Sequence, residues 1–181
     1  MKALFLDRDG VINIDHGYVS QIAEFEFTEG IFEFCQRAKA SDFKIIVVTN
    51  QSGIGRGYYQ EQDFWTLTNW MCEQFKAKGV EVSQVYFCPH HPEKAIGQYL
   101  QICQCRKPEP GMLLQAQQEF NIDMSQSVMV GDKHSDMQVA DRAGVKWRLK
   151  ISAEPDELAH CHGKQLADLQ AYCLQQQIFK N

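Results

Sequence analysis

Two aspartates one residue apart, Asp7 and Asp9, directly follow a short apolar run near the start of the sequence. Residues of this type and spacing are suited to phosphate transfer. Asp7 can attack phosphorus and form an aspartyl-phosphate, which replaces one difficult displacement by two easier ones. Asp9 can protonate the leaving alkoxide and then accept a proton from the attacking water. Because like charges so close together do not both ionise easily, we expect one pKa of the pair to be raised, as a general acid requires.

Further groups suited to phosphate transfer follow other apolar runs or precede a predicted helix; they are Thr49, Lys107, Asp132 and Asp136. In an open parallel sheet, ligands bind outside the carboxyl ends of the strands, so these groups should meet at one edge. Since a phosphate ester is anionic, a hard cation such as Mg²⁺ must screen the carboxylates, and Asp7 and Asp132 are the natural pair to hold it. Lys107 and the Thr49 hydroxyl would then stabilise the transferring phosphoryl group.

Each of these residues also has an ordinary structural interpretation, as a turn former, a helix cap or a solvated charge. Asp7, Asp9 and Gly10 could also begin a calcium-binding loop. That loop requires flanking helices and an acidic residue at its twelfth position, which here is Tyr18. The sequence therefore favours phosphate chemistry through the joint occurrence of these groups, in this order along the chain.

The elements that must position these groups alternate between strands and helices. Continuous apolar runs predict buried strands over residues 3–6, 43–48, 82–87, 127–130 and 145–149. Helical spacing predicts helices over residues 31–39, 60–78, 110–120, 135–142 and 164–179. This alternation indicates βαβ units and an α/β fold with a parallel sheet flanked by helices. We expect a single domain over residues 1–181.

The irregular stretch over residues 88–109 is long for a loop in a compact domain. It holds the pattern C-x-H, twelve intervening residues and C-x-C, and its candidate ligands are Cys88, His90, Cys103 and Cys105. Three thiolates and one imidazole suit a tetrahedral structural zinc site, which would fix a loop, here 88–105, that has few apolar residues to pack. His91 is an alternative ligand to His90. A Cys103–Cys105 disulfide would be strained, and chance clustering is the remaining alternative.

The other cysteines carry less information. Cys35, Cys72 and Cys173 fall on helical patterns, so we expect them to pack in the core. Cys161 lies between two histidines, but no matching half of a metal site is nearby. Since the seven cysteines are also odd in number, a complete disulfide framework is disfavoured.

Composition excludes several classes of function. The 23 acidic and 18 basic residues give a net charge of −5, which argues against a nucleic-acid partner. The apolar runs are far too short to span a bilayer, and the N-terminus lacks the features of a signal peptide. We therefore expect a cytoplasmic, monomeric protein that acts on a small molecule, without membrane partners.

The four motifs DxDG, TN, KP and GDxxxD resemble, in their order over about residues 3–149, those of the haloacid dehalogenase (HAD) superfamily of phosphatases. The resemblance implies a Rossmann-like sheet with the first strand central. It implies that Asp7 is the nucleophile, Asp9 the acid/base, and Thr49 and Lys107 the groups that stabilise the phosphoryl group. It implies Mg²⁺ bound by Asp7, the Asp9 backbone carbonyl and Asp132, with Asp136 in support.

The segments DRDGVIN, HGYV, TNQSGIGRGYY, CPHHP and CRKPEPGM closely resemble the D-glycero-D-manno-heptose 1,7-bisphosphate 7-phosphatases. That family removes the 7-phosphate on the route to ADP-heptose and lipopolysaccharide core precursors, and it lacks a large cap domain. Only residues 10–29 separate Asp9 from Gly30, which leaves no room for such a cap. The substrate-binding residues implied by the resemblance are Asp15, His16, Gly17, Tyr18, Asn50, Gln51, Ser52, Arg106 and Lys133.

Basic residues beyond those needed for one phosphate favour a bisphosphate substrate. Arg56, Arg106 and Lys133 fall near the same edge of the sheet and could bind a second anionic group. Histidinol phosphate, the substrate of a related family that shares the zinc loop, carries a cationic amine and would prefer a carboxylate there. It remains an alternative, as does a non-catalytic phosphate-binding or receiver-like domain, although receivers have no zinc loop and no need of Asp9. A phosphomutase would need a cap to exclude water, and the sequence leaves no room for one. A polynucleotide phosphatase would need a basic groove, which the net charge of −5 does not favour.

Overall fold

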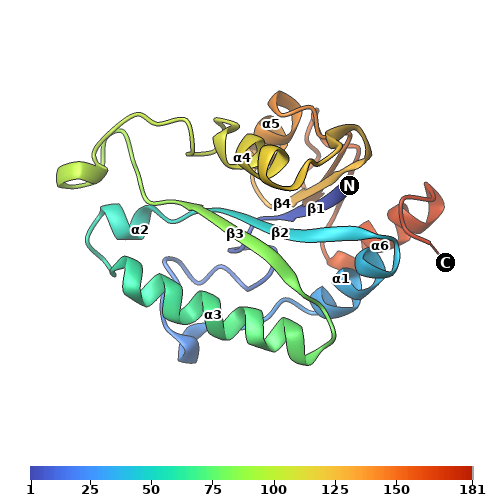
Figure 1. Ribbon diagram of the computed structural model, residues 1–181, viewed down its shortest axis with the longest axis horizontal. Coiled ribbons are helices and arrows are strands. Elements are labelled where there is room, and N and C mark those ends of the chain that lie inside the picture. Colours follow the sequence, from blue (N-terminus) through green and yellow to red (C-terminus); the bar gives the residue numbers. More distant parts are fainter. Residues whose placement is uncertain (181) are drawn as a thin grey trace.

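Six strands form one parallel sheet in the computed structural model, which describes residues 1–180 (Figure 1). The strands are β1 (Lys2–Leu6), β2 (Phe43–Asn50), β3 (Val82–Cys88), β4 (Val128–Gly131), β5 (Trp147–Ile151) and β6 (Cys161–Gly163). Their order is β3-β2-β1-β4-β5-β6, and every neighbouring pair is parallel. The prediction of a parallel α/β sheet with a central first strand is confirmed. Asn181, the last residue of the predicted domain, lies outside the described residues.

Helices cover both faces of the sheet (Figure 1). On one face lie α1 (Ile31–Ala40), α3 (Glu61–Ala77) and α6 (Leu166–Gln175). On the other face lie α4 (Gly111–Phe120) and α5 (His134–Arg142), and α2 (Ser52–Gly55) is a single turn after β2. None of the helices within residues 1–180 is long and apolar enough to cross a membrane.

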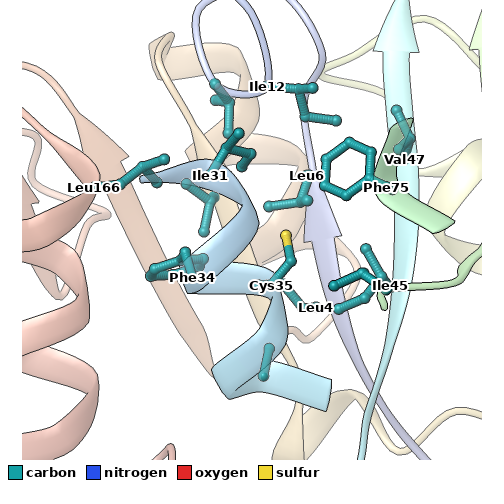
Figure 2. Close-up of a cluster of buried hydrophobic side chains, with 14 of the residues drawn as sticks. Leu4, Leu6, Ile12, Ile31, Phe34, Cys35, Ile45, Val47, Phe75 and Leu166 are labelled. Carbon is teal, nitrogen blue, oxygen red and sulfur yellow. The ribbon is translucent and has the colours of Figure 1, made fainter. Parts of the chain in front are cut away.

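The sheet separates two hydrophobic cores. Leu4 and Leu6 of β1 pack with α1, α3 and α6, whereas Ala3 and Phe5 pack with α4 and α5. Figure 2 shows the first core, in which Cys35 of α1 points toward Leu6 of β1. Since successive side chains of a strand point to opposite faces, burial of both faces requires the continuous apolar runs seen in the sequence.

Two boundaries differ from the prediction at turns that end helices. The last helix ends at Gln175 rather than 179, because Gln177 adopts a left-handed conformation (φ 57°) and the Ile178 N–H donates to Cys173 O. Strand β5 begins at Trp147 rather than 145, because the Val145 N–H still donates to Ala140 O and closes the turn after α5. Strand β6 was not predicted, since its three residues, Cys-His-Gly, carry no apolar run.

The segments between β1 and α1 and between β2 and α3 are short. Within the described chain they hold only the single turns Ile22–Glu24 and α2. The predicted absence of a large cap domain is therefore confirmed. The carboxyl ends of β1, β2 and β4 face a region that only loops enclose, and that region includes the long stretch between β3 and α4.

Candidate active site

Asp7 stands at the carboxyl end of the central strand. Its backbone N–H donates to Val130 O at 3.0 Å, which continues the β1–β4 pairing beyond the end of β1 and fixes the side chain at the sheet edge. Its Oδ1 accepts from the Arg8 N–H at 2.7 Å and lies 3.0 Å from Lys107 Nζ. The carboxyl group is 7% exposed. Asp7 is thus a rigid, nearly buried carboxylate with one oxygen already bound.

Lys107 connects three parts of the site. Its Nζ lies 3.0 Å from Asp7 Oδ1 and 2.6 Å from Asp136 Oδ1, and it donates to Val48 O at 3.0 Å. Burial opposes its charge, but the carboxylates of Asp136 and Asp7 outweigh burial and raise the pKa of Lys107. The Asn50 side chain bonds both the N–H and the C=O of Lys107, at 3.0 and 3.2 Å, and so attaches the loop after β3 to the end of β2.

Asp9 is held by three side chains. Its Oδ1 accepts from Arg8 Nη2 at 2.9 Å and from Asn13 Nδ2 at 3.1 Å. Its Oδ2 accepts from Gln51 Nε2 at 2.9 Å, and the same nitrogen donates to Thr49 Oγ1 at 2.9 Å. Asp9 lines a cleft, and the fully buried Thr49 is linked to Asp9 through the Gln51 amide. The sequence-predicted acid/base therefore faces open space with its carboxylate fixed from behind.

The carboxylates of Asp7, Asp132 and Asp136 lie within 4.8 Å of one another. Burial and the neighbouring carboxylates together raise the pKa of Asp7 to about 7, against the influence of Lys107. Burial likewise raises the pKa of Asp132 to about 6. The buried Lys107 and the exposed Lys133, whose Nζ lies 3.7 Å from Asp132 Oδ2, supply two positive charges for three carboxylates, so the site suits a cation.

Asp132 has the free donor atom that a metal needs. Its Oδ1 is buried and has no hydrogen-bond partner within residues 1–180. Asp136, by contrast, already pairs with Lys107, and its Oδ2 accepts from the N–H groups of Asp132 and Lys133. Gly10, with φ +88°, lets the loop after β1 approach the loop after β4, because a Cβ there would lie 2.4 Å from Asp132 Oδ2. Asp7 and Asp132 therefore fit Mg²⁺, while Asp136 positions the lysine and the loop after β4.

A cleft of 610 Å³ opens above these groups. All the sequence-predicted substrate-binding residues except His16 line it; they are Asp15, Gly17, Tyr18, Asn50, Gln51, Ser52, Arg106 and Lys133. The structure places His16 elsewhere, in a separate depression and 3.2 Å from Glu26 Oε2. We call this hollow the active-site cleft.

The second cluster is the predicted zinc-binding set, Cys88, His90, Cys103 and Cys105. The three Sγ–Sγ distances are 2.9, 3.4 and 3.5 Å, and His90 Nδ1 lies 3.4 and 3.7 Å from two of the sulfurs. Thiolates about 2.3 Å from a tetrahedral zinc ion would lie roughly 3.8 Å apart, so the set fits zinc with slight expansion. His91 is outside it, because its Nδ1 accepts from two backbone N–H groups. The cysteines form no disulfide.

The sulfur cluster and the active-site cleft are adjacent. Arg106 Nη1 donates to the backbone oxygen of His90 at 3.1 Å, and the same arginine lines the cleft. Across the cleft, Lys133 Nζ lies 3.5 Å from Asp15 Oδ2. Arg56 lies near the cleft, with its guanidinium 5.5 Å from the centre of the Tyr18 ring.

The sequence analysis missed three residues that build the site, Arg8, Asn13 and Tyr59. Arg8 is 1% exposed and donates to Val19 O as well as to Asp9. Its place between two candidate catalytic aspartates was a usable signal. Asn13 and Tyr59 gave none, because their contacts with the site arise only from the folded loops.

Comparisons with known proteins agree with this geometry. A family model described as HAD-hydrolase-like matches residues 104–149. A D-glycero-beta-D-manno-heptose-1,7-bisphosphate 7-phosphatase from Yersinia pestis is 46% identical over 175 residues, covering 93% of each chain. The chain belongs to this family of HAD phosphatases. A D-glycero-alpha-D-manno-heptose-1,7-bisphosphate 7-phosphatase from Burkholderia mallei is 54% identical over 150 residues, covering 83% of this chain and 79% of that one.

A solved structure of the family shows the same fold. The D,D-heptose 1,7-bisphosphate phosphatase from B. bronchiseptica, complexed with magnesium and phosphate, has a TM-score of 0.81 at 27% identity. The alignment covers 97% of this chain and 99% of that one. The resemblance to HAD phosphatases stated from the sequence motifs is confirmed, and with it the class of phosphoric monoester hydrolases.

We expect Mg²⁺ to stabilise the protein above about pH 7.5 and much less at about pH 5. Because the pKa values of Asp7 and Asp132 are raised from 3.8 to about 7 and about 6, protonation of these groups favours the folded state. In metal-free protein the two protonated carboxyl groups contribute their full stabilisation below about pH 4. That stabilisation is lost as the pH rises through their raised pKa values. Mg²⁺ would offset that loss, by about 2.7 kcal/mol at 100 times its Kd.

Thermal unfolding with EDTA or Mg²⁺ measures this effect. Asp132→Asn should abolish the rise in Tm with Mg²⁺ while making metal-free protein more stable at neutral pH. Asp141→Asn, which alters an exposed aspartate of α5, is the matched control and should respond as wild type does. An unchanged Mg²⁺ response in Asp132→Asn would exclude Asp132 as a metal ligand.

Proposed function

We propose that this chain removes the 7-phosphate of D-glycero-D-manno-heptose 1,7-bisphosphate, a step toward ADP-heptose and lipopolysaccharide core precursors. The observation that carries this proposal is the convergence of Asp7, Asp9 and Lys107 beneath one cleft. It occurs in a chain 46% identical, over 93% of its length, to a protein named for that reaction. The proposed catalytic residues are Asp7, Asp9, Thr49 and Lys107.

The first step is attack by Asp7 on phosphorus. Its Oδ1 is bound by the Arg8 N–H and Lys107, whereas its Oδ2 accepts no hydrogen bond within the part of the chain that the structure describes. Oδ2 therefore forms the new O–P bond while the bond between phosphorus and the sugar oxygen breaks. Asp9 donates its proton to that oxygen, and the product is an aspartyl-phosphate plus the sugar alcohol.

The second step is hydrolysis of the aspartyl-phosphate. Asp9, now a carboxylate, accepts a proton from water as the water oxygen attacks phosphorus and the bond to Asp7 breaks. Lys107 and the Thr49 hydroxyl stabilise the phosphoryl oxygens. Asp7, the Asp9 carbonyl and Asp132 would hold Mg²⁺, which would offset the repulsion between the anionic phosphate and the carboxylates.

Substitution of Asp7 tests this mechanism. Asp7→Asn should lower phosphate release from heptose 1,7-bisphosphate by at least about 10⁴-fold, because an amide is a poor nucleophile and a weak metal ligand. The far-UV spectrum and Tm should show a folded protein. Steady-state turnover within about ten-fold of wild type would remove Asp7 from its proposed role.

The second phosphate of the substrate is proposed to bind Arg106 and Lys133. Both line the active-site cleft, and the bond from Arg106 to His90 O fixes the guanidinium at the cleft wall. A fixed cation at this position would bind the anomeric phosphate while the 7-phosphate lies at Asp7. Remote binding of this kind orients the reacting ester and can raise the rate of the chemical step.

Arg106→Ala should therefore reduce kcat/KM about 10- to 150-fold for the bisphosphate, and much less for a simple sugar monophosphate. Arg37→Ala on the exposed face of α1 is the control. Equal losses on both substrates would show that Arg106 serves the reacting phosphate or the fold. Faster turnover of histidinol phosphate than of every sugar bisphosphate would favour the alternative substrate.

Zinc is the proposed occupant of the sulfur cluster, where it would be structural. All four candidate ligands face one another, which leaves no position for substrate. Contact with the Cys88 thiol lowers the pKa of Cys105 to about 5, so this thiol is ionised at neutral pH, as metal binding requires.

Metal analysis should find about one zinc ion per chain in protein purified without chelators. Cys105→Ser should lose zinc and lower the Tm, because it removes the contribution of zinc binding to folding, on the order of several kcal/mol. Cys72→Ser, on α3 away from the cluster, should keep zinc. Absence of zinc from wild-type protein would contradict the assignment.

We further propose that residues 1–181 form one domain, with the zinc loop over 88–105, that acts as a monomer in the cytoplasm. Both hydrophobic cores pack against the same sheet, which supports a single domain. The net charge of −5 supports the absence of a nucleic-acid partner.

A further inference from the structure

Tyr59 lies beside the active-site cleft, but its ring is buried and only 8% of the residue is exposed. Its hydroxyl donates to Gln51 Oε1 at 2.5 Å. The amide nitrogen of the same Gln51 donates to Asp9 Oδ2 and to Thr49 Oγ1, both at 2.9 Å. One side-chain amide therefore links a buried tyrosine to the proposed acid/base and to a residue that binds the phosphoryl group.

The local fold is built around this tyrosine. The short helix α2 begins at Ser52, and a Cβ on its second residue, Gly53, would lie 2.3 Å from Cε1 of the Tyr59 ring. Only glycine allows so close an approach. The ring therefore packs directly on the backbone of the turn after β2. Its hydroxyl reaches Gln51, the residue before that turn.

The three hydrogen bonds determine which way the Gln51 amide points. Rotation of the amide by half a turn would place Oε1 against the Asp9 carboxylate, which has no proton to donate when ionised. Burial raises the pKa of Tyr59 to about 12, so the phenol remains a donor at neutral pH. Without that donor, the buried Oε1 would have no partner within residues 1–180, and the amide would be free to rotate.

Gln51 is also the one side chain of the described residues that donates to Asp9 Oδ2. Arg8 and Asn13 both bind the other oxygen, Oδ1. The rotation of the Asp9 carboxyl about its last bond is therefore fixed on one oxygen by Arg8 and Asn13 and on the other by Gln51. That rotation determines which Asp9 oxygen faces the cleft, and therefore which oxygen faces the leaving group.

We propose that Tyr59 is a positioning residue for the acid/base: its hydroxyl fixes the Gln51 amide, and the amide fixes the Asp9 carboxyl group toward the leaving oxygen. The inference rests on the proposed function, because it assumes that Asp9 protonates the leaving alkoxide. Tyr59 itself touches neither phosphate nor water in the reaction.

Tyr59→Phe tests the proposal, because it removes the hydroxyl and keeps the ring that packs on Gly53. For heptose 1,7-bisphosphate, whose alkoxide leaving group needs a proton, kcat should fall about ten-fold with little change in KM. For p-nitrophenyl phosphate, whose leaving group departs without a proton, the rate of the first step, followed as release of p-nitrophenol in a single turnover, should stay within about two-fold of wild type. The matched control is Tyr58→Phe, since Tyr58 is 61% exposed and keeps its ring contact with Tyr18.

A double-mutant cycle tests the route through Gln51. In a Gln51→Ala background, Tyr59→Phe should cause no further loss of kcat on the bisphosphate. Additive losses would overturn the route through Gln51. Equal losses of Tyr59→Phe on both substrates would show that Tyr59 acts through Thr49 or the fold, and an unchanged kcat would show that the hydroxyl is dispensable.

Asp9→Asn separates failure of this proposal from failure of the proposed function. An Asp9→Asn protein that turns over the bisphosphate as fast as wild type would refute the acid/base assignment and both proposals with it. An inactive Asp9→Asn protein together with a fully active Tyr59→Phe protein would refute only the positioning role.

Discussion

The active site depends on one lysine ammonium buried between two carboxylates. The Lys107 side chain is 2% exposed, and its Nζ lies 3.0 Å from Asp7 and 2.6 Å from Asp136. Burial of an uncompensated charge costs on the order of several kcal/mol. The lysine is therefore stable there only while both carboxylates are present. Asp7 follows β1, Asp136 lies in α5, and Lys107 lies in the loop before α4. This interaction therefore fixes three segments that are far apart in the sequence, and it places a cation beside the proposed nucleophile before any substrate binds.

The loop that carries Lys107 is long and has little apolar surface, so other contacts must hold it. Asn50 binds its backbone at the end of β2, the sulfur cluster gathers its two ends, and the Gly111 N–H donates to Gln104 O at 2.8 Å. A Cβ on Gly111 would lie 2.3 Å from that oxygen, so glycine is required where the loop enters α4. Order in this loop thus comes from polar groups and the sulfur cluster. Arg106, which lies one residue before the lysine, is positioned by the same contacts.

The sequence alone predicted the sheet and the groups at its edge, because parallel strands buried on both faces leave continuous apolar runs and their ends meet at one edge. Asp7 and Asp132 could be found by that rule, whereas Lys107 was predicted from its place before a helix. The end of the last helix could not, since it depends on the left-handed conformation of Gln177, a residue with no strong preference for it. His16 also shows the limit of motif matching, because the turn that follows Asp15 directs its side chain to Glu26.

The residue between the two proposed catalytic aspartates shows why part of the site follows only from the fold. Arg8 is almost fully buried, with its guanidinium 6.0 Å from the Phe64 ring centre, yet it bonds Asp9 and the backbone of Val19. An arginine in a core is stable when a carboxylate and carbonyl oxygens satisfy it. The requirement is mutual, because the same contact fixes one oxygen of Asp9 while Gln51 fixes the other. The loop that begins with Asp7 therefore folds around the buried Arg8, so the proposed acid/base is oriented by a group whose burial also stabilises the loop.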